Sequence, residues 1–157
     1  SLYLGETNTT IGYNAGTSIT SGFENTFIGV LAGRNTTTGG EAYQGDTFVG
    51  YNAGYTNTTG VANTFLGTNS GPFNTTGSQN TFIGVSSGSS NTSGRHNAFL
   101  GVHSGFRNTS GSYNTYLGPY AGDDGTGGGA TTFDSSIALG YRTNITASRQ
   151  LVVGSSD

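Results

Sequence analysis

A short signature recurs along the chain: a polar pair, two adjacent apolar residues and a glycine. Close copies, such as NTFIG, DTFVG and NTYLG, begin at Asn25, Asp46, Asn63, Asn80, Asn97 and Asn114. The glycine of the signature falls at residues 12, 29, 50, 67, 84, 101, 118 and 140, so the repeat is 17 residues long, with two longer intervals of 21 and 22. A repeat this short, without helical periodicity, is typical of one coil of a parallel β-solenoid, whose coils stack about 4.8 Å apart.

We therefore predict an all-β fold: a parallel β-solenoid (a β-roll or β-helix) of about eight 17-residue coils, forming one repeat domain over residues 1–157. The two longer intervals place insertions near 40–46 and 123–135. Glycines at three fixed places in the unit mark corners, where a positive φ or a close backbone approach is needed. A small Ala or Ser recurs three residues after the signature glycine, which suits a narrow interior.

The two adjacent apolar residues form two separate rows, because neighbouring side chains of a strand point to opposite faces. We expect the aliphatic row to fill the coil core: Ile11, Ile28, Val49, Leu66, Ile83, Leu100, Leu117 and Leu139. The aromatic row must then point outward: Phe27, Phe48, Phe65, Phe82, Phe99 and Tyr116. A long exposed apolar stripe indicates an interface, so we expect the aromatic row to be an oligomer interface, most naturally that of a homotrimer. The alternative is a wider coil that encloses both rows.

An Asn opens most of the repeats, and Asp46 takes its place once. Asn side chains that stack at the coil spacing can hydrogen-bond to one another along a solenoid, which satisfies buried amides. We interpret this row as a structural ladder rather than a set of ligands.

Composition narrows the classes of protein that fit. Only 8% of the residues are charged and 31% are hydrophobic, but nine Phe, nine Tyr and a net charge of −3 are not typical of a disordered chain. Five basic residues are too few for a nucleic-acid partner. The sequence has no apolar run that could span a bilayer and no signal peptide at its start, so we expect no membrane insertion. The absence of Cys excludes disulfides and thiolate metal sites.

Two parts of the sequence carry a resemblance. The repeats NTFIGVSSGSSNTSGRHNAFLGVHSGFRNTSGSYNTYLG resemble the glycine-rich repeats of bacterial and phage tail-fibre-like surface proteins. The sequence SSIALGYRTNITASRQLVVGSSD resembles the segment that precedes the C-terminal intramolecular chaperone in that group. It is also similar to the SIALG repeats of trimeric autotransporter adhesin heads, which form left-handed β-rolls. The resemblance implies an extracellular, homotrimeric, fibrous protein with an adhesive or structural role.

Two departures from those families limit what carries over. The unit of 17 residues is longer than the autotransporter head repeat, and no chaperone, anchor or coiled-coil stalk is recognisable within these residues. Because the chain opens inside a repeat (SLYLG), we expect it to be a processed product or part of a longer protein.

The motif N-x-[ST] marks possible glycosylation sites, and four of them recur at one point of each coil. The possible sites are Asn35, Asn57, Asn74, Asn91, Asn108 and Asn144, with a further copy of the motif at Asn8, and the four that recur run from Asn57 to Asn108. If glycosylated, they would give the solenoid a coat of sugars along one edge. The alternative is turn chemistry, since N-T-T-G is a good turn sequence in its own right.

Insertions in a solenoid emerge as surface loops, and loops carry recognition. The residues that we expect at a possible ligand loop are Tyr43, Gln44, Asp123, Asp124 and Phe133, although a plain solvent loop fits them as well. Two threonine rows, one starting at Thr26 and one at Thr58, stack at the coil spacing and raise a second possibility, ice binding. The first row is broken by Ala98, and the second lies against a glycine turn.

Catalytic chemistry finds little support. The eight acidic residues do not recur at one point of adjacent regular coils, as a paired-carboxylate hydrolase would need. His96 and His103 share a repeat but have no Cys or carboxylate at ligand spacing. GTGGGA at Gly125 lacks the flanking strand and helix of a dinucleotide loop, and DDG at Asp123 lacks the acidic repeat of calcium-binding solenoids. We expect no enzyme activity, no metal and no cofactor.

These observations lead to one main hypothesis and two alternatives. The main one is a structural segment of an extracellular fibre or adhesin, at a cell or virion surface, that self-associates as a homotrimer or filament. The first alternative is a fibre tip that binds a cell-surface glycan or receptor, and the second is an ice-binding solenoid.

Overall fold

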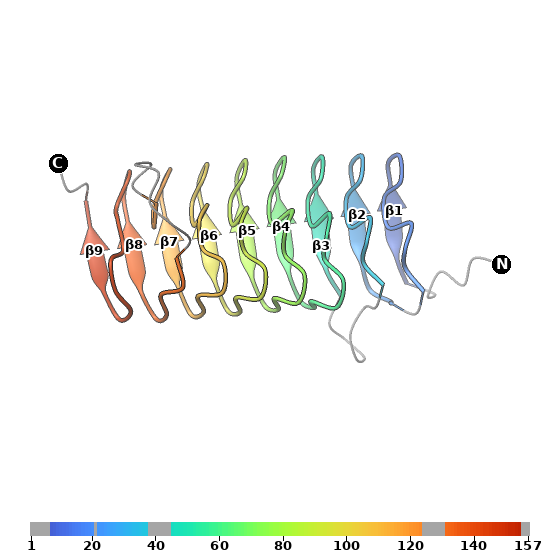
Figure 1. Ribbon diagram of the computed structural model, residues 1–157. Coiled ribbons are helices and arrows are strands. Elements are labelled where there is room, and N and C mark those ends of the chain that lie inside the picture. Colours follow the sequence, from blue (N-terminus) through green and yellow to red (C-terminus); the bar gives the residue numbers. More distant parts are fainter. Residues whose placement is uncertain (1–6, 21, 38–44, 124–130, 155–157) are drawn as a thin grey trace.

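The computed structural model describes residues 7–20, 22–37, 45–123 and 131–154. They form a rod of stacked coils with one short strand per coil, and β1 and β9 lie at opposite ends of the rod (Figure 1). The strands are β1 (Thr9–Ile11), β2 (Thr26–Ile28), β3 (Thr47–Val49), β4 (Thr64–Leu66), β5 (Thr81–Ile83), β6 (Ala98–Leu100), β7 (Thr115–Leu117), β8 (Ile137–Leu139) and β9 (Leu151–Val153). The prediction of an all-β parallel β-solenoid of about eight coils is confirmed, and the described residues contain no helix.

All nine strands belong to one parallel sheet, in the order of the sequence. Each strand pairs with the next so that equivalent repeat positions face each other, for example Phe65 with Phe82. The 21-residue interval leaves this register unchanged, since Phe27 still pairs with Phe48. The additional residues of this interval therefore add nothing to the strands and do not shift their pairing.

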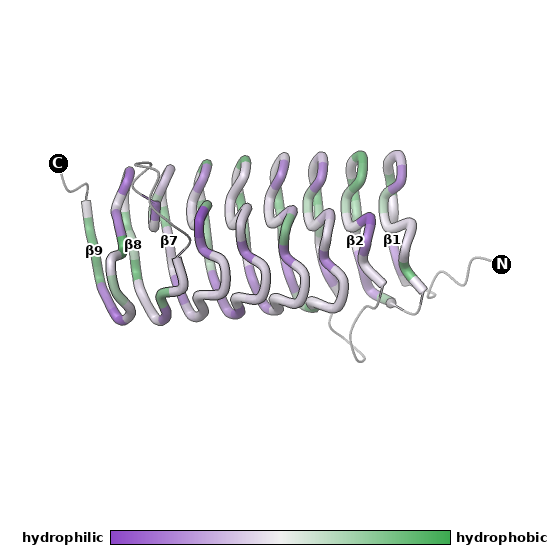
Figure 2. Tube along the Cα trace, in the orientation of Figure 1, coloured by the Kyte–Doolittle hydropathy of each residue, from purple (hydrophilic) through white to green (hydrophobic). Residues whose placement is uncertain are grey.

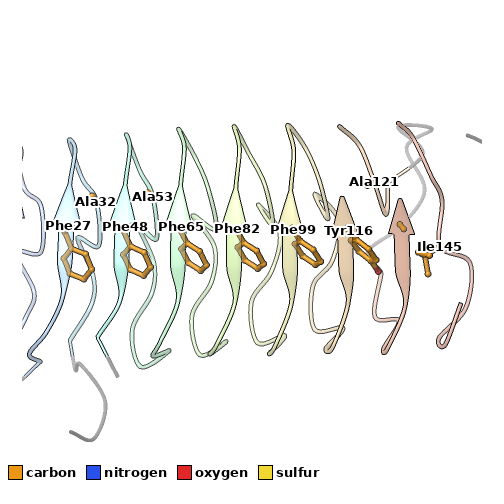
Figure 3. Packing of buried hydrophobic residues seen from close by; sticks show 11 residues of the cluster. Phe27, Ala32, Phe48, Ala53, Phe65, Phe82, Phe99, Tyr116, Ala121 and Ile145 are labelled. Atoms are coloured by element: carbon orange, nitrogen blue, oxygen red, sulfur yellow. The ribbon is translucent and has the colours of Figure 1, made fainter. Parts of the chain in front are cut away.

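The aromatic row lies inside the coil, and our prediction that it points outward is wrong. Its side chains are buried, with an exposed fraction of at most 1%: Phe27, Phe48, Phe65, Phe82, Phe99 and Tyr116. Their rings stack on one another along the rod, with centroids 4.7–5.0 Å apart (Figure 3).

The aliphatic row predicted as the coil core lies on the outer face. Leu66, Leu100 and Leu117 are 45–47% exposed. Ile11 is also exposed, and Ile28, Val49, Ile83 and Leu139 are half-buried. The structure therefore reverses the two predicted faces, and it does not have the wider coil that would enclose both rows.

The reason for the reversal is the width of the interior. Opposite each ring the chain carries a glycine and a small residue, for example Ser87 and Gly88 opposite Phe82. A Cβ atom on Gly88 would lie 2.4 Å from Cδ2 of Phe82, so no larger residue fits there. The space holds one flat side chain per coil, and a stack of aromatic rings fills it at the coil spacing.

The corners that follow the strands are equally tight. Gly84 has a φ of +131°, and a Cβ atom there would lie 2.5 Å from the carbonyl oxygen of Gly101 in the next coil. The signature glycine therefore serves both a positive φ and a close approach between coils, as predicted.

The core changes in the last coils, where the aromatic row ends at Tyr116. The next strand carries Ala138 at the inward position, and Ile145 adds bulk to the buried cluster at this end (Figure 3). Hydrophobic segments are short throughout the rod, and most of each coil is neutral or hydrophilic (Figure 2).

The predicted asparagine ladder is confirmed. The side-chain Oδ1 of Asn63 accepts hydrogen bonds from the backbone N of Asn80 (3.0 Å) and from its Nδ2 (3.2 Å). The same Nδ2 donates to the carbonyl oxygen of Gly94 at 2.8 Å. The structure adds a second buried column of Asn57, Asn74, Asn91 and Asn108. In it, for example, Nδ2 of Asn91 donates to Oδ1 of Asn74 at 2.7 Å.

Asp46 replaces Asn at the level where the second column begins. The coil before it has Thr36 in the register of Asn57, so Asn57 has no asparagine beneath it to accept its amide hydrogen. Oδ2 of Asp46 accepts from Nδ2 of Asn57 (2.9 Å), and Oδ1 accepts from the backbone N of Asn63 (2.8 Å). Burial raises the pKa of Asp46 to about 7, although these hydrogen bonds lower it in part.

The first prediction tests which row is the core. Phe65→Ala should lower the free energy of unfolding by about 3–5 kcal/mol, as expected for a buried Phe. Leu66→Ala, one residue along, should cost well under half as much, because its side chain is 45% exposed. Urea unfolding measures both, at protein concentrations where the midpoint does not depend on concentration. A larger loss of unfolding free energy for Leu66→Ala than for Phe65→Ala would instead support the aliphatic row as the coil core.

The second prediction concerns Asp46. The pKa of its carboxyl is about 7 in the folded chain and about 3.9 in an unfolded one, so between these values the folded state binds more protons. The free energy of unfolding should therefore fall as pH rises from 4 to 7, by up to about 1.4 kcal/mol per pH unit. Asp46→Asn should remove this slope, measured by urea unfolding at several pH values. Glu24→Gln, at an exposed position, is the control and should retain it.

Candidate functional site

A regular surface runs along the described strands: the outer sheet face, which we define as the first and third residues of strands β1–β9. The third residues form an aliphatic column, whose exposed fraction reaches 70% at Val153 in β9. The first residues form a threonine column, with Ala98 in β6 and with Ile137 and Leu151 in the last two strands. Both columns share one face because the strand alternates, with the aromatic row on the other side.

The hydroxyls of the threonine column make no hydrogen bonds within the described part of the protein, unlike those of the second threonine row, which starts at Thr58. In the second row the Oγ1 atoms donate to the next coil's backbone, as from Thr75 to the carbonyl oxygen of Thr92 at 2.9 Å. Within the described residues no side-chain hydrogen bond is made by Thr26, Thr47, Thr64, Thr81 or Thr115. The outer sheet face therefore presents methyl groups and unbonded hydroxyls in regular rows.

The outer sheet face is also uncharged, because none of its strand residues is ionisable. Ala98 interrupts the threonine column and leaves a shallow hollow of about 270 Å³ between β5 and β7, lined in part by Ile83, Leu100 and Leu117. An uncharged, half-apolar surface along the whole rod is the feature of this molecule that most strongly indicates an interaction site.

Four of the predicted glycosylation sites are not accessible for attachment of a sugar. Asn57, Asn74, Asn91 and Asn108 are fully buried, and their side-chain amides form the second asparagine column. A sugar on the amide nitrogen would break this column, so the prediction is wrong for these four residues. Asn35 and Asn144 are half-buried, and for them glycosylation stays a prediction.

The predicted ligand loops are only partly within the structure. Tyr43, Gln44 and Asp124 lie outside the described residues. Asp123 is buried and forms an ion pair with Arg107, with Nη1 and Oδ1 3.6 Å apart. Phe133 is half-buried against the core, and its carbonyl oxygen accepts from Nδ2 of Asn114 at 2.7 Å. Asp123 and Phe133 therefore have structural contacts and do not project as the prediction required.

The two histidines are engaged with aromatic neighbours. His96 stacks on Tyr113 and His103 stacks on Tyr120, with centroids 4.8 and 5.0 Å apart. Among the described residues no three His, Asp or Glu side chains lie close enough to hold a metal ion. The expectations of no enzyme activity, no cofactor and no nucleic-acid partner stay predictions. In the same ranges no helix is long and apolar enough to cross a bilayer.

A signal for the outer sheet face was present in the sequence. In T-F-I the threonine and the aliphatic residue flank the aromatic one, so they must share a face. A row of threonines on that face marks it as the side toward solvent, since hydroxyls without partners are costly to bury. Taking the apolar pair without the preceding threonine led to the reversed assignment.

Comparison with known proteins adds no relative on which to base a function: the chain matches no protein-family model, no curated protein and no solved structure.

Proposed function

We propose that the chain is a structural segment of an extracellular fibre or adhesin, and that its copies associate through the outer sheet face as a homotrimer. The observation that carries the proposal is the aliphatic column, whose residues are exposed or half-buried on the outer face, although the buried core is formed without them. The outer sheet face thus replaces the aromatic row as the proposed oligomer interface, which we call the seam.

A second copy of the chain is the occupant that suits this face best. The face has no charge that would need a counter-charge on a partner, and its columns repeat at the coil spacing. An identical face therefore matches it in register and in polarity along the full length. Closed symmetric assembly of parallel rods would bury the aliphatic column in every copy, and the resemblance to trimeric surface fibres favours three copies.

The interior supports a mechanical role. The parallel sheet joins every coil to the next, and in the middle of the rod two asparagine columns and the ring stack join them as well. Contacts are confined to neighbouring coils, so the rod can extend by adding coils without a new kind of contact. Such a rod suits a spacer or shaft.

Ice binding is the second candidate, because the unbonded hydroxyls and methyl groups of the outer sheet face are regularly spaced. The same face cannot be covered by another copy and contact ice, so the oligomeric state separates the two functions. The remaining alternative, a receptor- or glycan-binding fibre tip, would use other surfaces.

The third prediction follows from the seam. Light scattering of the native protein should give three times the chain mass of 16.0 kDa. Leu100→Glu should reduce this to a single chain, because a carboxylate in the seam would lose its hydration without a partner. Ser110→Glu introduces the same charge at an exposed turn and should leave the mass unchanged.

A native chain that scatters as a monomer would contradict the seam. In that case thermal hysteresis of the native chain, lost in Leu100→Glu and kept in Ser110→Glu, would establish the ice-binding alternative.

A further inference from the structure

A second hollow, of about 340 Å³, lies among the turns that follow strands β3, β4 and β5. Two aromatic rings, Tyr55 and Phe73, contribute to its wall together with Pro72. The rest of the lining is polar but uncharged: the amides of Asn52 and Asn69 and the hydroxyls of Ser86 and Ser89. None of these residues belongs to a strand, so the hollow and the outer sheet face are built from different residues.

The hollow arises from side-chain size at one repeat position. Successive coils carry Tyr55, Pro72, Ser89 and Phe106 in equivalent places. The small Ser89 therefore leaves a gap before Phe106, which packs against His103 with ring centroids 4.9 Å apart. On the other side, Tyr55 is held in place by a hydrogen bond from Nη1 of Arg34 to its hydroxyl, at 2.8 Å. The Tyr55 wall is thus fixed by a contact outside the hollow.

The polar lining has unused hydrogen-bonding groups. Nδ2 of Asn52 donates to Oδ1 of Asn69 at 3.3 Å, while Oδ1 of Asn52 is buried and has no partner among the described residues. No hydrogen bond within those residues uses Nδ2 of Asn69 or the hydroxyls of Ser86 and Ser89. Because Oδ1 of Asn52 is closed off from solvent, the groups that the hollow offers are the amide donor of Asn69 and two hydroxyls, beside aromatic rings.

We propose that this hollow binds a neutral sugar ring of a glycan. A pyranose has C–H groups on its faces, which pack on aromatic rings, and hydroxyls around its edge, which pair with amides and hydroxyls. The volume lies at the lower end of the range of about 300–1,000 Å³ for ligand sites, which suits one sugar unit or a short piece of a chain. No residue of its lining carries a charged side chain, which favours a neutral ligand over a charged one.

The proposal is independent of the seam on the outer sheet face. The chain would have the hollow both as a trimer and as a monomer, because no residue of the aliphatic or threonine column lines it. A fibre with this property would carry its recognition site on the shaft.

The fourth prediction is a titration of the isotope-labelled full chain with D-glucose, D-galactose, D-mannose or N-acetyl-D-glucosamine, followed by amide NMR shifts. At least one of these sugars should give saturable shifts at the side-chain amides of Asn52 and Asn69, with a Kd in the millimolar range, as expected for so small a ligand in an open hollow. D-galacturonate should bind at least tenfold more weakly than its neutral counterpart D-galactose.

Two variants and a control locate the binding. Ser89→Phe fills the hollow with the residue type that the next coil carries at the same position, and should weaken binding at least tenfold. Phe73→Ser removes a wall at an exposed position, so it tests the same point without changing the core. Thr17→Phe makes the matching change in the first coil and should bind as the native chain does.

Failure of all four neutral sugars to cause saturable shifts at Asn52 and Asn69 would overturn the proposal. So would binding that survives Ser89→Phe and Phe73→Ser, because the ligand would then lie elsewhere. Light scattering on the same samples keeps this outcome separate from the outcome for the seam.

Discussion

Contact between aromatic rings of successive coils is the interaction on which the other features of this rod depend. Neighbouring rings lie 4.7–5.0 Å apart and nearly parallel, which matches the spacing of the parallel strands that carry them. The ring leaves no space opposite, so Gly88 and Gly105 cannot be replaced by a residue with a Cβ atom without displacing Phe82 or Phe99. The composition of the chain, rich in glycine and poor in aliphatic core residues, follows from an interior that is one ring wide.

Polar side chains complete the interior, which is unusual for a core. Asn amides within the columns can be buried at little cost because they find a donor and an acceptor in the neighbouring coils, although Oδ1 of Asn108, at the end of the second column, is buried without a partner among the described residues. Where the second column begins, the hydroxyl of Thr36 has no hydrogen bond with Asn57, and the carboxyl of Asp46 accepts from Asn57 instead. The break in the repeat thus has a local cause: the ladder needs an acceptor there, and the acid introduces a pKa near neutrality.

The outward position of the aliphatic residues follows from the narrow interior. Since the core accepts one large side chain per coil, the aliphatic residue of each strand must face outward, and it forms a continuous column with little charge near it. Away from the strands, the turn residues vary in size from coil to coil without disturbing the sheet. The hollow at Ser89 is one result of this variation. Assembly and recognition can therefore reside on separate surfaces of the same repeat.

The sequence by itself determined the repeat length, the parallel solenoid, the corner glycines and the asparagine ladder, because each depends on spacing along the chain. It also determined that Phe82 and Ile83 lie on opposite faces, since a strand alternates. Which face is the inside was decided by the tertiary structure, through the fit of a flat ring between a strand and the turn at Gly88. The same holds for Asn57, Asn74, Asn91 and Asn108, which the sequence allows as surface turn residues. Only the folding of each coil back on itself buries their amides against the next coil.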